Sequence, residues 1–152
     1  MRYFFLLMIG AFLFSCESQK LDGKGTAMDF KQIEYNLYGT NETANHVVVN
    51  DKSSFERQWR TLHQNMSPIP AVPQVDFGKN TVIIVNFGQM NHGGHHASVN
   101  HVYRVGDTVH VELNSKTPSA GEMVTTVMTN PYLILSTEKF VHNNVSLHST
   151  TN

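Results

Sequence analysis

The pattern of apolar and polar residues predicts a domain built mostly from β-strands. The segment from Ile33 to Tyr38 alternates apolar and polar residues, as a half-buried strand does, and residues 47–49 are three consecutive valines. The run from Thr81 to Phe87 is typical of a central strand that is buried on both faces. Further extended segments are expected at residues 95–103, 108–114, 124–128, 132–137 and 140–147.

The segments 95–103 and 108–114 are expected to form a hairpin. Gly106-Asp107 between them suits a tight two-residue turn. In the first of these strands the spacing of apolar residues changes from two to three. This break in the period predicts a β-bulge near Asn100-His101.

One amphipathic helix is expected at residues 54–65. Ser53 and Glu56 have the spacing of a capping box at its start, and Pro68 marks the extended connector that follows it. Apolar residues at helical spacing indicate the face that packs on the core: Phe55, Trp59, Leu62 and Met66. The expected fold class is therefore α+β, a mostly antiparallel β-sheet with one amphipathic helix packed on it.

The first fifteen residues are typical of a lipoprotein signal peptide. Arg2 supplies a positive charge, and the apolar run after it is too short for an ordinary membrane-spanning helix. The run ends in Leu13-Phe14-Ser15-Cys16, which resembles a bacterial lipobox with Cys16 as the lipidated residue. The alternatives are an uncleaved anchor, or secretion with a free cysteine.

The expected organisation follows from this reading of residues 1–15. Residues 16–30 are polar and are expected to form a lipidated, flexible tether, and residues 31–148 a single globular domain. Lipidation would place the protein in the bacterial cell envelope. Glu17 is not the aspartate that often marks inner-membrane retention, which favours the outer membrane.

Composition narrows the classes of function. The chain has 152 residues and a formal net charge of -1, whereas a nucleic-acid binder would carry a basic excess. Its single cysteine excludes an intrachain disulfide and a multi-cysteine zinc site. The sequence has neither a serine nucleophile motif nor a glycine-rich phosphate loop that opens a helix, so we do not expect an enzyme.

Residues 81–136 resemble the C-terminal domain of the PrcB family of protease complex subunits. The resemblance rests on three features: a strand followed by a glycine pair in Gly88–Gly94, a Pro-x-x-Gly loop with Met-Val-Thr in Pro118–Thr125, and a Thr-x-Pro-Tyr step at Thr129–Tyr132. It implies a small, non-catalytic envelope domain that accompanies a secreted protease. In the first feature, Asn91-His92-Gly93-Gly94-His95 replaces a family pattern close to Pro-Thr/Ser-Gly-Gly-Tyr.

The loop Gly88–His96, joined by the loop Pro118–Gly121, is the predicted binding surface, because function tends to lie on loops held by rigid scaffolds. The expected partner is a protease or another envelope protein. Tyr132 is interpreted either as a structural residue at the entry to a strand or as an anchor for the partner. The candidate partner-binding residues are Gly88, Asn91, His92, Gly93, Gly94, His95, Pro118, Gly121 and Tyr132.

The histidines allow an alternative function. Nine occur in the chain, and His92, His95 and His96 lie in one loop, where a flexible glycine pair can direct two imidazoles at one ion. Zn²⁺ or Cu²⁺ would suit these ligands, and Met90 could add a soft ligand for Cu(I). If this segment is a strand, His96 points away from His95. The other interpretations are an exposed polar loop that binds no cofactor, and a pH-responsive surface.

Three further side chains are expected to be structural or solvated. His110 and Glu112 alternate with apolar residues, so we expect them on the solvated face of their strand. His63 follows Leu62 in the predicted helix and is interpreted as a surface or capping group.

Overall fold

The computed structural model describes residues 20–21, 25–141 and 144–151, and all structural statements concern these residues. The elements follow one another as β1 (Lys20–Leu21), β2 (Gly25–Ala27), β3 (Phe30–Asn36), β4 (Asn45–Val49), α1 (Lys52–Leu62), β5 (Asn80–Asn86), β6 (His96–Val105), β7 (Thr108–Lys116), β8 (Tyr132–Glu138) and β9 (Val145–Thr151).

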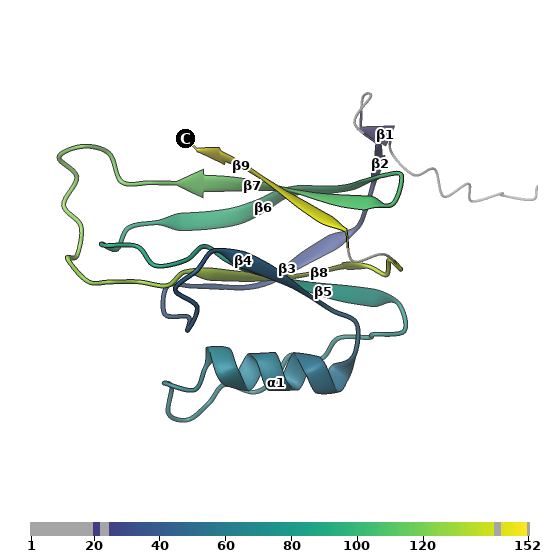
Figure 1. Ribbon diagram of the computed structural model, residues 1–152, viewed down its shortest axis with the longest axis horizontal. Coiled ribbons are helices and arrows are strands. Elements are labelled where there is room, and N and C mark those ends of the chain that lie inside the picture. The colour runs from purple at the N-terminus through teal and green to yellow at the C-terminus, as the bar shows by residue number, and fades with distance from the viewer. Residues whose placement is uncertain (1–19, 22–24, 142–143, 152) are drawn as a thin grey trace, which may run out of the picture.

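The elements form three layers (Figure 1). One layer is a five-stranded sheet in the order β1-β2-β6-β7-β9, and the middle layer is a four-stranded sheet in the order β3-β8-β5-β4. The helix α1 covers the outer face of the four-stranded sheet. All paired strands are antiparallel except β7 and β9, which run parallel. The expected α+β class is confirmed, and the strands divide into two stacked sheets.

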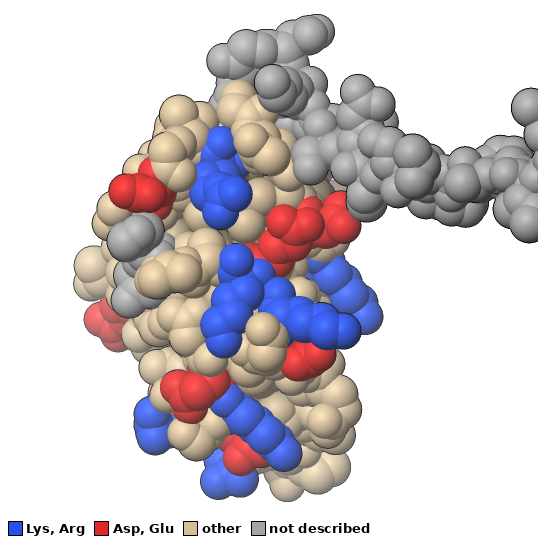
Figure 2. Space-filling view, turned by 90° about the vertical axis from the view of Figure 1, so that its right-hand side faces the viewer, with Lys and Arg blue, Asp and Glu red and all other residues tan. Residues whose placement is uncertain are grey.

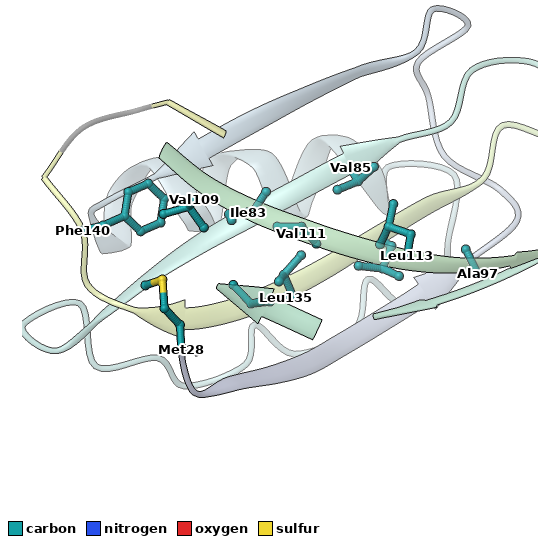
Figure 3. Close-up of a cluster of buried hydrophobic side chains, with 11 residues drawn as sticks. Met28, Ile83, Val85, Ala97, Val109, Val111, Leu113, Leu135 and Phe140 are labelled. Atoms are coloured by element: carbon teal, nitrogen blue, oxygen red, sulfur yellow. The ribbon is translucent and has the colours of Figure 1, made fainter. Parts of the chain in front are cut away.

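The middle sheet is buried on both faces, which explains its continuous apolar runs. In β5 and β8, alternate side chains enter two different clusters because successive residues point to opposite faces of a sheet. One set packs between the two sheets, where Figure 3 shows Ile83, Val85 and Leu135 with residues of β6 and β7. The other set packs against the helix and consists of Val82, Ile84, Tyr132 and Ile134. The prediction of a doubly buried central strand is confirmed.

The helix begins earlier than predicted, and its cap is a different residue. The Oδ1 atom of Asp51 accepts hydrogen bonds from the Ser54 backbone N–H at 2.9 Å and from the Ser53 hydroxyl at 2.7 Å. Asp51 is therefore the N-cap, and the prediction of a capping box led by Ser53 is wrong. The apolar stripe is confirmed as a core face for Phe55, Trp59 and Leu62, which are all buried; the helix ends at Leu62 and not at residue 65, so Met66 lies beyond it.

The predicted hairpin is formed by β6 and β7, with its turn at Gly106-Asp107. Its register shifts between Val99 and His101, so the expected β-bulge is confirmed. Two other expectations need correction. Residues 124–128 belong to no strand, and the strand of the tail is β9, which begins only at Val145.

The N-terminal region contributes more to the domain than expected. The strand β2 pairs with the end of β6, and Met28 is 6% exposed in the core between the sheets. The globular domain therefore includes residues that were assigned to the tether. Cys16 and the expected signal peptide lie outside the described residues. Within the described part of the chain, no helix is both long and apolar enough to cross a membrane.

Candidate functional site

The two predicted loops lie side by side and are joined through their backbones. We call residues 87–95 and 117–131 the two-loop surface; they connect β5 to β6 and β7 to β8. Met90 and Thr129 donate to each other's carbonyl oxygens at 2.8 and 2.9 Å. The Gly93 N–H donates to the Thr125 carbonyl oxygen at 2.9 Å. These bonds give each loop a fixed position relative to the other.

The glycine pair makes this close approach possible. A Cβ atom on Gly93 would lie 2.4 Å from the Thr125 hydroxyl oxygen, which is far inside contact distance. Gly94 has a φ of +84°, and a Cβ atom there would lie 2.8 Å from the Pro118 ring. The Gly94 position therefore requires glycine for the second loop to pass across the first, whereas a side chain at Gly93 would force Thr125 to move.

The predicted partner-binding residues differ in how far they reach solvent. Those that are exposed or half-buried are Asn91, His92, Gly94, His95, Pro118 and Gly121. Gly88 and Gly93 are buried and shape the backbone instead. The structure thus brings the predicted loop residues together, apart from Tyr132.

Tyr132 does not lie on this surface. Its side chain is 0% exposed in the layer between the helix and the four-stranded sheet. Its hydroxyl donates to Glu34 Oε1 at 3.0 Å and lies 3.0 Å from His63 Nε2. Burial, followed by the nearby Glu34 charge, raises the pKa of Tyr132. The interpretation of Tyr132 as a partner anchor is therefore wrong.

His63 is also buried, contrary to its interpretation as a surface or capping group. The side chain is fully enclosed, and its Nδ1 atom lies 2.8 Å from the Trp59 carbonyl oxygen. Its Nε2 atom lies 3.0 and 3.1 Å from the two oxygens of Glu34. Both ring nitrogens therefore lie within hydrogen-bond distance of oxygen atoms of other residues. The group is a structural link between α1, β3 and β8.

Sequence reasoning missed the apolar side chains of the second loop. Met123 is 99% exposed, Met128 61% and Val127 42%. The sequence predicted an extended segment at residues 124–128, which assigned Val127 and Met128 to a strand and not to an exposed loop. Exposed methionines adapt their shape to different partners and are frequent on binding surfaces.

The three loop histidines do not converge. The rings of His92 and His95 are stacked with their centroids 4.6 Å apart, whereas His96 lies against Tyr35, with the ring centroids 5.0 Å apart. The pKa of His95 is lowered, first by burial and then by the charge of His92. Among the described residues, no group of three or more His, Cys, Asp or Glu side chains is arranged to hold a metal ion.

His110 and Glu112 lie on the outer side of β7, half-buried by their neighbours. His110 Nδ1 lies 2.9 Å from His148 Nε2 on β9, and Glu112 Oε2 lies 3.4 Å from His101 Nδ1 on β6. The expectation that both face away from the core is confirmed. They form cross-strand pairs there and do not merely face solvent.

These features define a small, β-rich, two-sheet domain whose candidate site is a pair of joined loops. Residues 81–138 match the model of the family described as PrcB C-terminal, which confirms the resemblance of this segment. The match runs from β5 to β8 and contains the whole two-loop surface. The search of curated proteins and the search of solved structures gave no match.

Proposed function

We propose that this protein is a lipid-anchored, non-catalytic domain of the bacterial cell envelope that acts as an accessory subunit of an envelope or secreted protease. The family of residues 81–138 suggests association with a protease complex. The observation that carries the proposal is that this family segment contains both loops of the exposed surface. The protease would bind there.

The two-loop surface is suited to binding a folded partner. Its backbone is held by hydrogen bonds between the loops, so little conformational entropy is lost when a partner binds. Met123, Val127 and Met128 offer apolar area that the domain itself leaves in water. Asn91 and His92 on the other loop add polar groups to the surface, as an interface rim requires.

Co-purification tests this role. The full chain with an affinity tag is expressed in its native host, and the eluate is examined by mass spectrometry and for cleavage of casein. Replacing Met123 and Met128 by Ser should lower recovery of the protease by roughly tenfold, because buried apolar contacts at the centre of an interface carry most of its affinity. The matched control is Ile69→Ser, since Ile69 is 46% exposed but lies outside the two loops.

The possible outcomes separate the two parts of the proposal. Equal recovery of the protease with the double variant and with the control would show that the two-loop surface is not part of the interface. If the unaltered chain recovers no protease, the proposal that its partner is a protease is rejected. Lipidation is tested separately, by the mass of the N-terminal peptide and by loss of the chain from the membrane fraction in Cys16→Ser.

Metal binding by the loop is the second candidate function. It is favoured by the closeness of His92 and His95, whose ring centroids are 4.6 Å apart. Two imidazoles and solvent would hold Cu²⁺ or Zn²⁺. Titration of the metal-free chain should give a dissociation constant below about 1 µM. This binding should be lost in His92→Ala/His95→Ala and kept in His46→Ala; equal binding by both variants would reject the site.

A further inference from the structure

The exposed apolar side chains are divided between the two ends of the sandwich. One group lies at the end of the two-loop surface, where β3, α1 and β7 end (Figure 1). The other group lies at the opposite end, near the β6–β7 turn and the β8–β9 connection. It consists of Val141, which is 89% exposed, Val105, which is 48% exposed, and Phe30, which is 38% exposed. We call these three residues the anchor-end group.

The N-terminal segment enters the domain at this same end. Residue Thr26 of β2 pairs with Arg104, next to Val105, and Lys20 of β1 pairs with Thr26. Cys16 precedes Lys20 by four residues, and four residues span at most about 14 Å even when fully extended. A lipid on Cys16 would therefore hold this end close to the bilayer.

The charges at this end do not oppose contact with lipid headgroups. Figure 2 views the molecule from this side and shows basic and acidic side chains interleaved, with neither sign covering the face. Contact with the membrane would therefore depend on the apolar residues more than on net charge. Charged residues in the segments that reach this end include Asp29, Lys31, Asp51, Lys52, Asp76, Lys79, Arg104, Asp107, Glu138 and Lys139.

We propose that this end of the sandwich rests on the membrane surface, with Phe30, Val105 and Val141 in the interfacial layer of the bilayer. The inference rests on the lipid anchoring proposed for Cys16. Apolar side chains on turns gain by entering the boundary between headgroups and acyl chains when an anchor keeps them close. The two-loop surface then points away from the bilayer, where a partner can reach it.

Fluorescent labels at single positions can test this orientation. Cys16 is the only cysteine of the chain, and lipidation blocks it, so a second cysteine is a unique site for an environment-sensitive dye. The lipidated full chain is reconstituted into phosphatidylcholine vesicles as Val141→Cys, Val105→Cys or Met123→Cys. Met123 is the matched control, because it is 99% exposed at the far end.

The expected result is that labels at 141 and 105 emit at shorter wavelength and are quenched at least about twofold more strongly by spin-labelled lipid than the label at 123. Equal quenching at all three positions in a chain that is lipidated and floats with the vesicles would overturn the orientation alone. A chain that carries no lipid would reject the anchoring and this inference together. Quenching at 141 that requires anionic lipid and disappears in salt would reject apolar insertion.

Discussion

Replacement of His63 tests the most unexpected part of the structure. The imidazole is fully buried and joins the helix to two strands through the Trp59 carbonyl, the Glu34 carboxylate and the Tyr132 hydroxyl. His63→Ala removes all these contacts and leaves a void of the size of the ring. The Glu34 carboxylate and the Tyr132 hydroxyl then lose the imidazole as a hydrogen-bonding partner.

The expected loss of stability can be estimated from these contacts. A buried polar group that loses its hydrogen-bonding partner costs about 1–3 kcal/mol, and the void left by the ring adds to this cost. The Glu34 side chain is 20% exposed, so water can replace part of the lost hydrogen bonding after the substitution. We therefore expect His63→Ala to lower the free energy of unfolding by about 2–4 kcal/mol. Glu34→Gln should cost less, because the amide oxygen still accepts from Tyr132.

Urea unfolding followed by tryptophan fluorescence measures this effect, because the only tryptophan, Trp59, contacts His63 with ring centroids 4.1 Å apart. The control is His46→Ala, whose side chain is exposed on β4 and which should change stability by less than about 0.5 kcal/mol. A cost below about 1 kcal/mol for His63→Ala, or one equal to that of the control, would refute the buried network.

Three other predictions follow from local geometry. Gly94→Ala should destabilise the domain by about 2–3 kcal/mol in urea unfolding, more than Gly121→Ala, because both have positive φ but only Gly94 also has a neighbour in the way. An NMR titration should give His95 a pKa below its ordinary value, and His92→Ala should raise this pKa only in part, because burial is the larger cause. Because the folded state binds the proton of His95 less readily than the unfolded chain does, the domain loses stability as the pH falls through about 6.5. Asp51→Ala should lower the thermal midpoint, whereas Asp51→Asn should largely keep it; the contribution of Asp51 is lost as the pH falls from about 4 towards its pKa of about 2.

Sequence patterns predicted the features that depend on neighbouring residues. The apolar run in β5 indicated a strand buried on both faces, and the break in period in β6 located the bulge between Val99 and His101. The buried network could not be predicted in this way. His63 is 29 residues from Glu34 and 69 from Tyr132, and no periodicity links them. A histidine after an apolar stripe fits a surface position equally well until its partners are known.

The candidate site was predicted only in part, because it too depends on contacts between residues far apart in the sequence. Each loop was identified by its turn residues, but the pairing of Met90 with Thr129 joins segments that only the tertiary fold brings together. The sequence predicts an extended segment at residues 124–128, yet these residues belong to no strand. Their apolar side chains are therefore part of the exposed surface, whereas the sequence alone placed these residues in a sheet.

The topology explains why anchoring and partner binding can occupy opposite ends of so small a domain. The ten-residue strand β6 begins beside the two-loop surface at His96 and ends at Val105, where β2 pairs with it. Ten strand residues extend about 33 Å, roughly the length of the sandwich. The segments after β5 and β7 are the two loops. Both lie at the end where β6 and β8 begin, because β5 runs antiparallel to β8 and β7 runs antiparallel to β6. Val141 and Met123 are thus far enough apart for substitutions at the two positions to act independently. A substitution at Val141 should change membrane contact without changing partner recovery, and a substitution at Met123 should do the reverse.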